Sequence, residues 1–176
     1  MLQIRTAILS FGISGRVFDA PFIHLHPGFE LYGVWERTKS ESASFYPGIK
    51  IFRTLEELLA DGSIELVIVN TPTATHFDYT KKVLEAGKHA VVEKAFTATV
   101  EEAIQLKELA DSSGKIVSVF QNRRWDSDFK TVKKIVQEGW LGEIMEAEFH
   151  FDRYKEELSP KTHKEIPSPG AGLLND

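Results

Sequence analysis

The stretch TAILSFGISG, residues 6–15, carries a short apolar run directly into a turn that contains two glycines. An amphipathic segment through Val17 and Phe18 follows, so the order predicts a strand, a tight turn and a helix. In dinucleotide-binding folds this turn lets backbone N–H groups and a helix N-terminus face a pyrophosphate. We expect Gly12 to let the backbone approach the phosphates and Gly15 to let the helix pack closely on the strand.

The glycine pattern of this turn is incomplete. Ser10 stands at the first glycine position of G-x-G-x-x-G, where serine can serve if no positive φ is required, and its hydroxyl can contact a phosphate. Two glycines three residues apart fit an ordinary strand–helix turn equally well. Their place between a first strand and a helix favours nucleotide binding. The predicted phosphate contacts are Ser10, Phe11, Gly12, Ile13 and Ser14.

An acidic residue, Glu36, follows the second expected strand, residues 31–35, and the nucleotide-binding pattern has such a residue roughly 20 positions after its turn. A carboxylate there can accept both hydroxyls of an adenosine ribose and repel a 2′-phosphate, which favours NAD. Arg37 and Lys39 favour NADP, because either cation can hold that phosphate. A solvated charged loop is the structural alternative. The sequence thus favours NAD slightly and leaves NADP open.

Further apolar runs alternate with helix-like segments, which is the pattern of β-α-β units on a parallel sheet. Most runs are continuously apolar, as in strands that are buried on both faces. A capping box formed by Thr99 and Glu102 starts the last of these helices. We therefore predict an α/β fold over residues 1–121, a Rossmann-type doubly wound parallel sheet that binds NAD(P). The further expected strands are 66–69, 90–92 and 116–120, and the expected helices are 55–59, 79–84 and 99–110.

The pattern changes after the last of these strands. Asp126 or Ser127 can cap a helix that carries apolar side chains at helical spacing. Residues 143–151 then alternate between apolar and acidic side chains, which predicts a strand with one exposed face and a need for a partner strand. Residues 159–172 are rich in Pro, Lys and Gly and predict a loop. We expect residues 122–176 to begin an α+β second domain that is incomplete.

Composition argues against several classes of site and partner. The chain has 176 residues, a formal net charge of −5 and no cysteine, which excludes disulfides and thiolate metal sites and argues against a nucleic-acid partner. No segment approaches the roughly 20 apolar residues that span a bilayer, and the start lacks a secretory signal, so we expect a cytoplasmic protein without a membrane partner. His24 and His26 lack carboxylates at ligand spacing and predict a surface turn, not a metal site.

Several segments resemble a known family. Residues 86–99, AGKHAVVEKAFTAT, resemble the EKP segment of the glucose–fructose oxidoreductase and inositol dehydrogenase family (Gfo/Idh/MocA). Residues 70–76, NTPTATH, resemble its loop after the fourth strand, and residues 122–129, NRRWDSDF, resemble the segment that enters its C-terminal domain. Residues 170–176, GAGLLND, resemble the lead into its substrate-site helix. With the glycine turn, these matches in register cover nearly the whole chain.

The resemblance implies an oxidoreductase that transfers a hydride between NAD or NADP and a sugar, polyol or related carbonyl. Lys94 corresponds to the lysine of EKP, where a cation can stabilise alkoxide character on the substrate. Asp176 corresponds to the aspartate of the family's acid–base pair. A solvated surface lysine is the structural alternative for Lys94, and helix capping or a core hydrogen bond is the alternative for His76. The cofactor contacts that the resemblance implies are Thr71, Pro72, His76, Glu93 and Lys94.

At two positions this sequence departs from the pattern of the family. Ala95 stands where the family has proline, and because a non-proline cis peptide bond costs about 2.5–4 kcal/mol, we predict a trans bond after Lys94. The sequence stops at Asp176, whereas the family's histidine comes four residues after that aspartate. We therefore expect this chain to bind dinucleotide with little or no turnover by itself. A non-catalytic NAD(P)-binding or sensing module is the alternative, and a homo-oligomer is compatible with the family's habit of associating through its C-terminal sheet.

Overall fold

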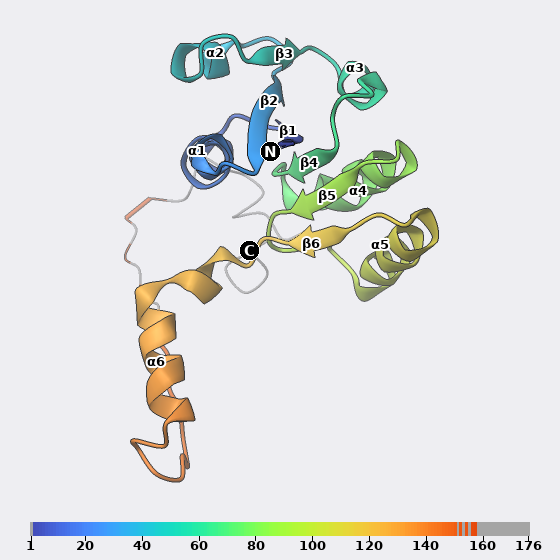
Figure 1. Cartoon of the computed structure of the whole chain (residues 1–176). Coiled ribbons are helices and arrows are strands. Elements are labelled where there is room, and N and C mark those ends of the chain that lie inside the picture. The colour runs from blue at the N-terminus through green and yellow to red at the C-terminus, as the bar shows by residue number, and fades with distance from the viewer. Residues whose placement is uncertain (1, 151, 153, 155, 158–176) are drawn as a thin grey trace.

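A computed structural model describes residues 2–150, 152, 154, 156 and 157. The strands are β1 (Ile4–Ile8), β2 (Phe29–Trp35), β3 (Lys50–Phe52), β4 (Leu66–Val69), β5 (His89–Val92) and β6 (Val117–Val119). They form one parallel sheet in the order β3-β2-β1-β4-β5-β6 (Figure 1). The chain extends the sheet from β1 first in one direction and then in the other, so the topological switch lies between β1 and β4. The predicted Rossmann-type fold is confirmed.

The helices lie on both faces of this sheet, with α1 on one side and α3, α4 and α5 on the other (Figure 1). Their bounds are α1 (Ala20–Leu25), α2 (Glu41–Phe45), α3 (Leu55–Ala60), α4 (His76–Glu85), α5 (Val100–Ser113) and α6 (Ser127–Gln137). Thr99 and Glu102 form the predicted capping box of α5, and Thr54 and Glu57 form a second one at α3. Among the described helices, none combines the length and the apolar character of a membrane span.

The core lies on both faces because neighbouring residues of a strand point to opposite sides. Ala7 of β1 packs with Val67 and Val69 of β4 in the cluster that α3 and α4 cover. Ile8 packs with Ile68 in the cluster that α1 covers. The continuous apolar runs of the sequence therefore belong to strands that are buried on both faces.

Two features near the N-terminus differ from the sequence-based expectation. β3 spans only three residues, a run too short to predict a strand. The helix after the glycine turn begins π-helical over Gly15–Asp19 and continues as α1. Val17 and Phe18, expected on its apolar side, are 51% and 36% exposed. A π-helical turn holds more residues than an α-helical one, which changes the positions that are buried. In this turn the buried residues are Gly15 and Asp19.

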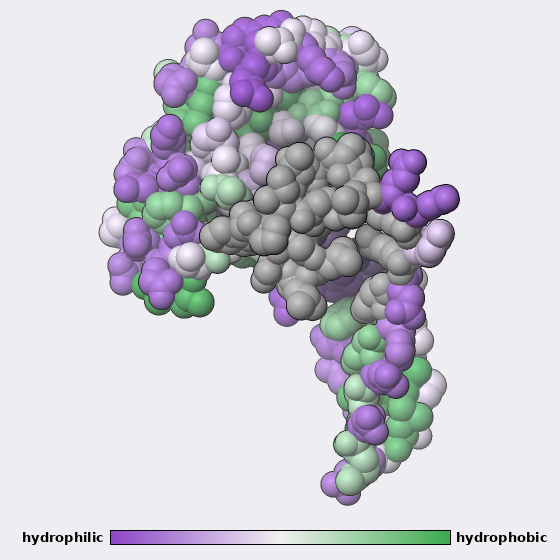
Figure 2. All heavy atoms as spheres, turned by 180° about the vertical axis from the view of Figure 1, so that it is seen from behind, coloured by the Kyte–Doolittle hydropathy of each residue, from purple (hydrophilic) through white to green (hydrophobic). Residues whose placement is uncertain are grey.

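α6 extends away from the sheet and buries none of its residues (Figure 1). Its apolar side chains Phe129, Val132 and Val136 are each about half exposed. Figure 2 shows apolar surface along this projecting part of the molecule. Within the part of the chain that the structure describes, no element covers this side of α6.

Residues 143–150 form no strand, so the strand predicted at 143–151 is wrong over its described part. A strand requires the N–H and C=O groups of a neighbouring strand, and none of the described strands pairs with this segment. Alternating side chains indicate which residues would face a sheet, but they do not supply that sheet. Residue 151 and the loop predicted at 159–172 lie outside the described residues.

Candidate functional site

The predicted phosphate turn lies where β1 ends, at the C-terminal edge of the parallel sheet. Gly12 donates its backbone N–H to Ser10 Oγ at 3.3 Å, and Arg16 donates its N–H to the Gly12 carbonyl oxygen at 3.0 Å. The first turn of a helix leaves N–H groups without intrahelical acceptors. Gly12 and Ile13 are exposed, so the turn is open to solvent at the edge where α/β sheets bind their ligands.

The two glycines of the turn serve different needs, and neither has a positive φ. A Cβ at Gly15 would lie 2.2 Å from the Ser10 carbonyl oxygen, so only glycine lets the helix pass this close to the strand end. A Cβ at Gly12 would meet only Ser10 Oγ, at 3.6 Å, which is an ordinary contact. The packing of the protein therefore requires glycine at position 15 and does not require it at position 12.

Side chains from three strand ends meet behind this turn. Asn70, after β4, donates its Nδ2–H to the Ser10 carbonyl oxygen and to Asp19 Oδ2, both at 2.9 Å. Ser14 Oγ lies 3.3 Å from Asp19 Oδ2 and forms a short hydrogen bond with Oε1 of Glu93, which follows β5. We call Ser14, Asp19, Asn70 and Glu93 the acidic cluster. It links the ends of β1, β4 and β5.

Asp19 is a member of this cluster that the sequence does not single out. It is 5% exposed, and burial raises the pKa of its carboxyl to about 6. The charge of Glu93 adds to this rise in pKa, whereas hydrogen bonds from Asn70 and Ser14 oppose it. In the sequence Asp19 stands just before Pro21 and has the pattern of an ordinary helix cap, so only the folded arrangement identifies it.

Glu36 follows β2 as expected, but its carboxylate points into the protein. Its Oε1 accepts the backbone N–H of Glu41 at 2.9 Å, and its Oε2 accepts the N–H and Oγ–H of Ser42 at 3.1 Å and 2.5 Å. The residue is only 7% exposed. Glu36 therefore holds the N-terminus of α2, and these donors compete with a ribose for the same oxygens.

Arg37 is exposed next to Glu36, in a loop whose backbone Arg53 holds in place. The Arg53 guanidinium donates to the carbonyl oxygen of Glu36 at 2.9 Å and to that of Lys39. Lys39, the other cation considered for a 2′-phosphate, forms an exposed ion pair with Glu41 at 2.8 Å. The loop after β2 thus has a defined backbone and presents Arg37 at the surface.

His76 is fully buried at the start of α4. Its Nδ1 lies 2.7 Å from the carbonyl oxygen of Ala95, and its Nε2 lies 2.7 Å from that of Thr71. The ring therefore joins the loop after β4 to the segment after β5, which is the core hydrogen bonding that the sequence left open as an alternative. Thr71 is half-buried, whereas Pro72 and Ala74 are exposed at the surface of this loop.

Lys94 is exposed directly after β5, and its backbone N–H donates to Glu93 Oε2 at 3.2 Å. The peptide bond between Lys94 and Ala95 is cis, which corrects the trans bond predicted from the absence of proline. That prediction considers residue type alone. In the structure, a hydrogen bond between the Ala95 carbonyl oxygen and the His76 ring holds this segment. The structure therefore places Lys94 at the same sheet edge as the phosphate turn, one residue from the acidic cluster.

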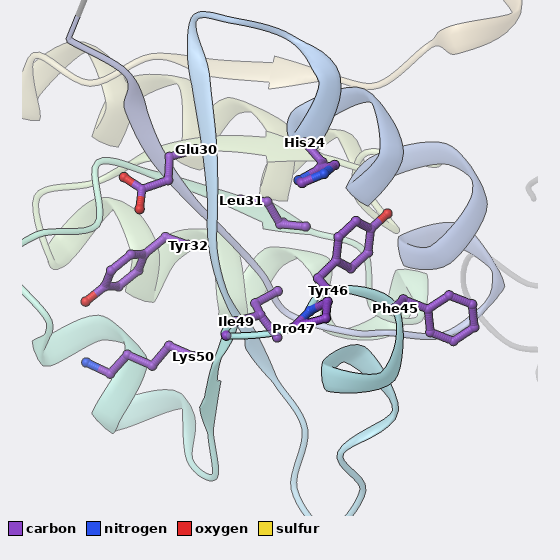
Figure 3. A pocket seen from close by; sticks show the side chains of 10 residues that line it. His24, Glu30, Leu31, Tyr32, Phe45, Tyr46, Pro47, Ile49 and Lys50 are labelled. Atoms are coloured by element: carbon purple, nitrogen blue, oxygen red, sulfur yellow. The ribbon is translucent and has the colours of Figure 1, made fainter.

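Asp176, the other predicted catalytic residue, lies outside the described residues. A hollow of about 330 Å³ lies along β2 and the segment after α2, with His24, Tyr46 and Lys50 in its wall (Figure 3). None of the predicted site residues lines this hollow, so it is separate from the phosphate turn. The described residues contain no group of three or more His, Asp or Glu side chains that could hold a metal ion.

Residues 4–121 match the model of a family described as an oxidoreductase family with an NAD-binding Rossmann fold. An uncharacterised oxidoreductase of Schizosaccharomyces pombe is 47% identical over 99% of this chain and 49% of its own length. The scyllo-inositol 2-dehydrogenase (NADP(+)) IolW of Bacillus subtilis is 38% identical over 98% of this chain and 48% of its own length. The scyllo-inositol 2-dehydrogenase (NAD(+)) of the same organism is 32% identical over 80% of this chain and 42% of its own length.

A solved structure of an oxidoreductase from Yersinia pestis has the same fold, with a TM-score of 0.87 and 40% identity over 99% of this chain and 49% of that chain. The chain thus spans about half the length of the relatives it matches. The glycine turn, the acidic cluster and Lys94 all lie within the range that the family model matches. The chain belongs to the Gfo/Idh/MocA family of NAD-binding oxidoreductases.

Proposed function

We propose that this chain is the nucleotide-binding part of an oxidoreductase that transfers a hydride between a nicotinamide cofactor and a sugar, polyol or related carbonyl. The observation that carries the proposal is Gly12. Its exposed backbone has room for a Cβ, so the protein's own packing gives no reason for glycine at this position. A pyrophosphate against the backbone gives such a reason, because a side chain would occupy the place of the ligand.

The other groups of the turn fit a dinucleotide. The backbone N–H groups at the start of the helix can bind the pyrophosphate. Phe11 and Ile13, the neighbours of Gly12 in the chain, are further proposed contacts of this turn. The Ser10 hydroxyl oxygen accepts the Gly12 N–H, and its hydrogen can be donated to a phosphate oxygen.

Lys94 is the proposed catalytic residue of the described part. When bound, the nicotinamide ring supplies or accepts the hydride. The ammonium of Lys94 can stabilise the negative charge that develops on the substrate oxygen and orient that hydroxyl. We propose Asp176 as the group that exchanges the proton, and residues 122–176 as the start of the substrate domain. The 38% identical scyllo-inositol 2-dehydrogenase supports a polyol as the substrate class.

We further propose NADP as the preferred cofactor and Arg37 as the residue that recognises its 2′-phosphate. The expectation of NAD depended on a Glu36 carboxylate that is available to a ribose, yet three donors of α2 already bind it. Arg37 lies exposed on the same loop, and a guanidinium suits a phosphate. The more similar of the two Bacillus dehydrogenases is the NADP-dependent one, which supports the same choice.

Calorimetric titration of this chain with NADP and with NAD tests the cofactor choice. We expect NADP to bind about tenfold more tightly, and Arg37→Ala to remove most of that difference. Lys39→Ala is the matched control, because it removes a cation of the same loop that already has a carboxylate partner. Equal affinities for the two nucleotides would contradict the NADP proposal. Binding of neither nucleotide would overturn the proposed function.

The role of Gly12 has its own test. Gly12→Val is expected to prevent binding of both nucleotides, because its side chain occupies the proposed place of the ligand. We expect it to change the thermal unfolding midpoint little, because a Cβ at this position meets only Ser10 Oγ, at 3.6 Å. Gly62→Val is the control, since Gly62 is exposed, has no positive φ and has no neighbour within 4 Å. Normal nucleotide binding by Gly12→Val would contradict the role that we propose for Gly12.

The family resemblance implies an acid–base histidine for an active enzyme, whereas a non-catalytic module needs none. A reading frame that continues past Asp176 with a histidine at the fourth position supports the enzyme. In such a protein, assayed over polyols and aldoses, Lys94→Ala is expected to lower kcat by about two orders of magnitude or more and to change cofactor affinity little. Equal losses in kcat and cofactor affinity would remove the catalytic role of Lys94.

A further inference from the structure

The acidic cluster contains two carboxyl groups joined by one hydroxyl. Ser14 Oγ forms a short hydrogen bond with Glu93 Oε1 and lies 3.3 Å from Asp19 Oδ2. A serine hydroxyl has a single hydrogen, so it can donate to only one of these two carboxylates at a time. If both carboxyls were ionised, the second contact would bring two acceptors face to face.

The remaining contacts indicate where an additional proton belongs. Glu93 is half-buried, and its Oε2 also accepts the backbone N–H of Lys94, so Glu93 is the natural acceptor for the Ser14 hydroxyl. Asp19 is nearly fully buried, and besides Ser14 the donor that reaches it from the described residues is Asn70 Nδ2, at 2.9 Å. A protonated Asp19 donates its O–H to Ser14 Oγ, and Ser14 donates its own O–H to Glu93. The two carboxyls and the hydroxyl that joins them then have suitable partners.

We propose that Asp19 is a positioning residue for nucleotide binding, which holds a proton in the nucleotide-bound protein and, through Ser14, fixes the phosphate turn against the strand end that presents Lys94. This inference rests on the proposed binding of a dinucleotide at the turn. It gives the buried carboxyl of Asp19, behind the turn, a role in the affinity for the cofactor and in the pH dependence of that affinity.

Charge favours the protonated form of Asp19 when a nucleotide is bound. The groups that face Asp19 are Ser14 of the turn, Asn70 after β4 and Glu93 after β5, and Glu93 is the charged one. Burial and this charge already raise the pKa of Asp19 to about 6. A pyrophosphate at the turn adds negative charge on the other side of Ser14, which opposes a second ionised carboxyl. Nucleotide binding should therefore take up protons near neutral pH and weaken as the pH rises.

Calorimetric titration with NADP between about pH 5.5 and pH 8, in buffers of different ionisation enthalpy, measures both affinity and proton uptake. We expect the affinity of the unaltered chain to fall at least about fivefold across this range, relative to Asp19→Asn. Asp19→Asn preserves the shape and does not titrate. Its Nδ2 can donate to Ser14 Oγ, but the variant then loses the hydrogen bond from Asn70 Nδ2, which binds the same oxygen, Oδ2, in the unaltered chain. Its affinity is expected to lack the part of the pH dependence that the titration of Asp19 causes. Comparison of the two proteins at each pH cancels the titration of the 2′-phosphate of NADP, a phosphate monoester whose second pKa is about 6.

Two further variants separate this role from a general structural one. Asp111→Asn removes an exposed carboxylate that pairs with Lys107, and it is expected to behave as the unaltered chain. Ser14→Ala breaks the link to Glu93 and is expected to weaken binding both by itself and in combination with Asp19→Asn. The proposal is overturned if Asp19→Asn shows the pH dependence and proton uptake of the unaltered chain. Failure of the unaltered chain to bind nucleotide at any pH would overturn the proposed function instead.

Discussion

Glu36 and Asp19 are buried to a similar extent, but different groups surround their carboxyls. Glu36 is 7% exposed and Asp19 is 5% exposed. Two backbone N–H groups and one hydroxyl donate to Glu36. Asp19 has one amide donor and a hydroxyl that it shares with Glu93, whose charge acts against a second anion. Depth of burial alone therefore does not describe a buried acid, because the number of its donors and the charge of its neighbours also act on it.

The two carboxyls also differ in how far along the chain their partners lie. The donors to Glu36 come from residues 41 and 42, so this cap forms together with α2. The partners of Asp19 include Asn70 after β4 and, through Ser14, Glu93 after β5. Asp19 therefore has all of its hydrogen-bond partners only when the C-terminal edge of the sheet is formed. A change in the groups at that edge then changes the surroundings of its carboxyl.

The largest expected effect is that of Glu36→Ala. This change leaves two N–H groups and a hydroxyl at the start of α2 without their acceptor, so we expect the free energy of unfolding to fall by about 3–4 kcal/mol. Glu36→Gln retains an acceptor and should cost about half as much. Urea unfolding followed by circular dichroism measures both. A loss below about 1 kcal/mol would show that α2 does not depend on Glu36.

Asp19→Asn comes next, and its effect depends on pH. The pKa of Asp19 is raised from 3.8 to about 6 in the folded protein, so between these values the folded state binds more protons than the unfolded state. The free energy of unfolding therefore falls as the pH rises through this window, by about 2–3 kcal/mol for this group. The amide introduced by Asp19→Asn does not titrate, so the advantage of this variant should grow between about pH 4 and pH 6. Parallel stability curves for the two proteins would contradict the raised pKa.

Asn70→Ala tests the comparison further, because it removes a hydrogen-bond donor to the Asp19 carboxyl. We expect a loss of about 1–2 kcal/mol in the free energy of unfolding and a further rise in the pKa of Asp19, which moves its pH window upward. Thr80→Val is the matched control, because the Thr80 hydroxyl is buried without a partner among the described residues, and its removal should cost little. Denaturant unfolding at several pH values measures both variants. An unchanged pH window in Asn70→Ala would show that Asn70 does not influence Asp19.

Glu41→Gln should have the smallest effect. The side chain of Glu41 pairs with Lys39 on the surface, whereas its backbone N–H binds Glu36 and is unchanged by the substitution. Surface ion pairs contribute little to stability. We expect no measurable change in the unfolding midpoint at moderate salt. A clear decrease would mean that the charge of Glu41, and not only its backbone, supports the loop after β2.

The fold could be predicted where its signals are local. β4 occupies the predicted residues Leu66–Val69, because a continuous apolar run between polar segments marks it. The start of α5 follows from the capping box of Thr99 and Glu102. β3 is too short to be predicted, and the strand predicted at 143–151 does not form over its described residues, 143–150, for a common physical reason. Strand formation depends on a neighbouring strand, which a single segment of sequence does not reveal.

The candidate site could be predicted in position but not in detail. The order of strands brings the residue 10–15 turn and Lys94 to one edge of the sheet, as expected for a parallel α/β fold. The inward direction of Glu36, the buried Asp19 and the cis bond after Lys94 were not foreseen. Each involves contacts that only the folded chain brings together. The role of Asp176 stays a prediction.

The contrast between the two glycines of the turn has a consequence for saturation mutagenesis. At position 15 the 2.2 Å approach of a Cβ to the Ser10 carbonyl oxygen should eliminate every substitution from a library screened only for folded protein. At position 12 the same screen should pass many of them, and a second screen on immobilised nucleotide should then remove most survivors. Comparison of the two screens would distinguish, within one short turn, the substitutions that prevent folding from those that prevent nucleotide binding.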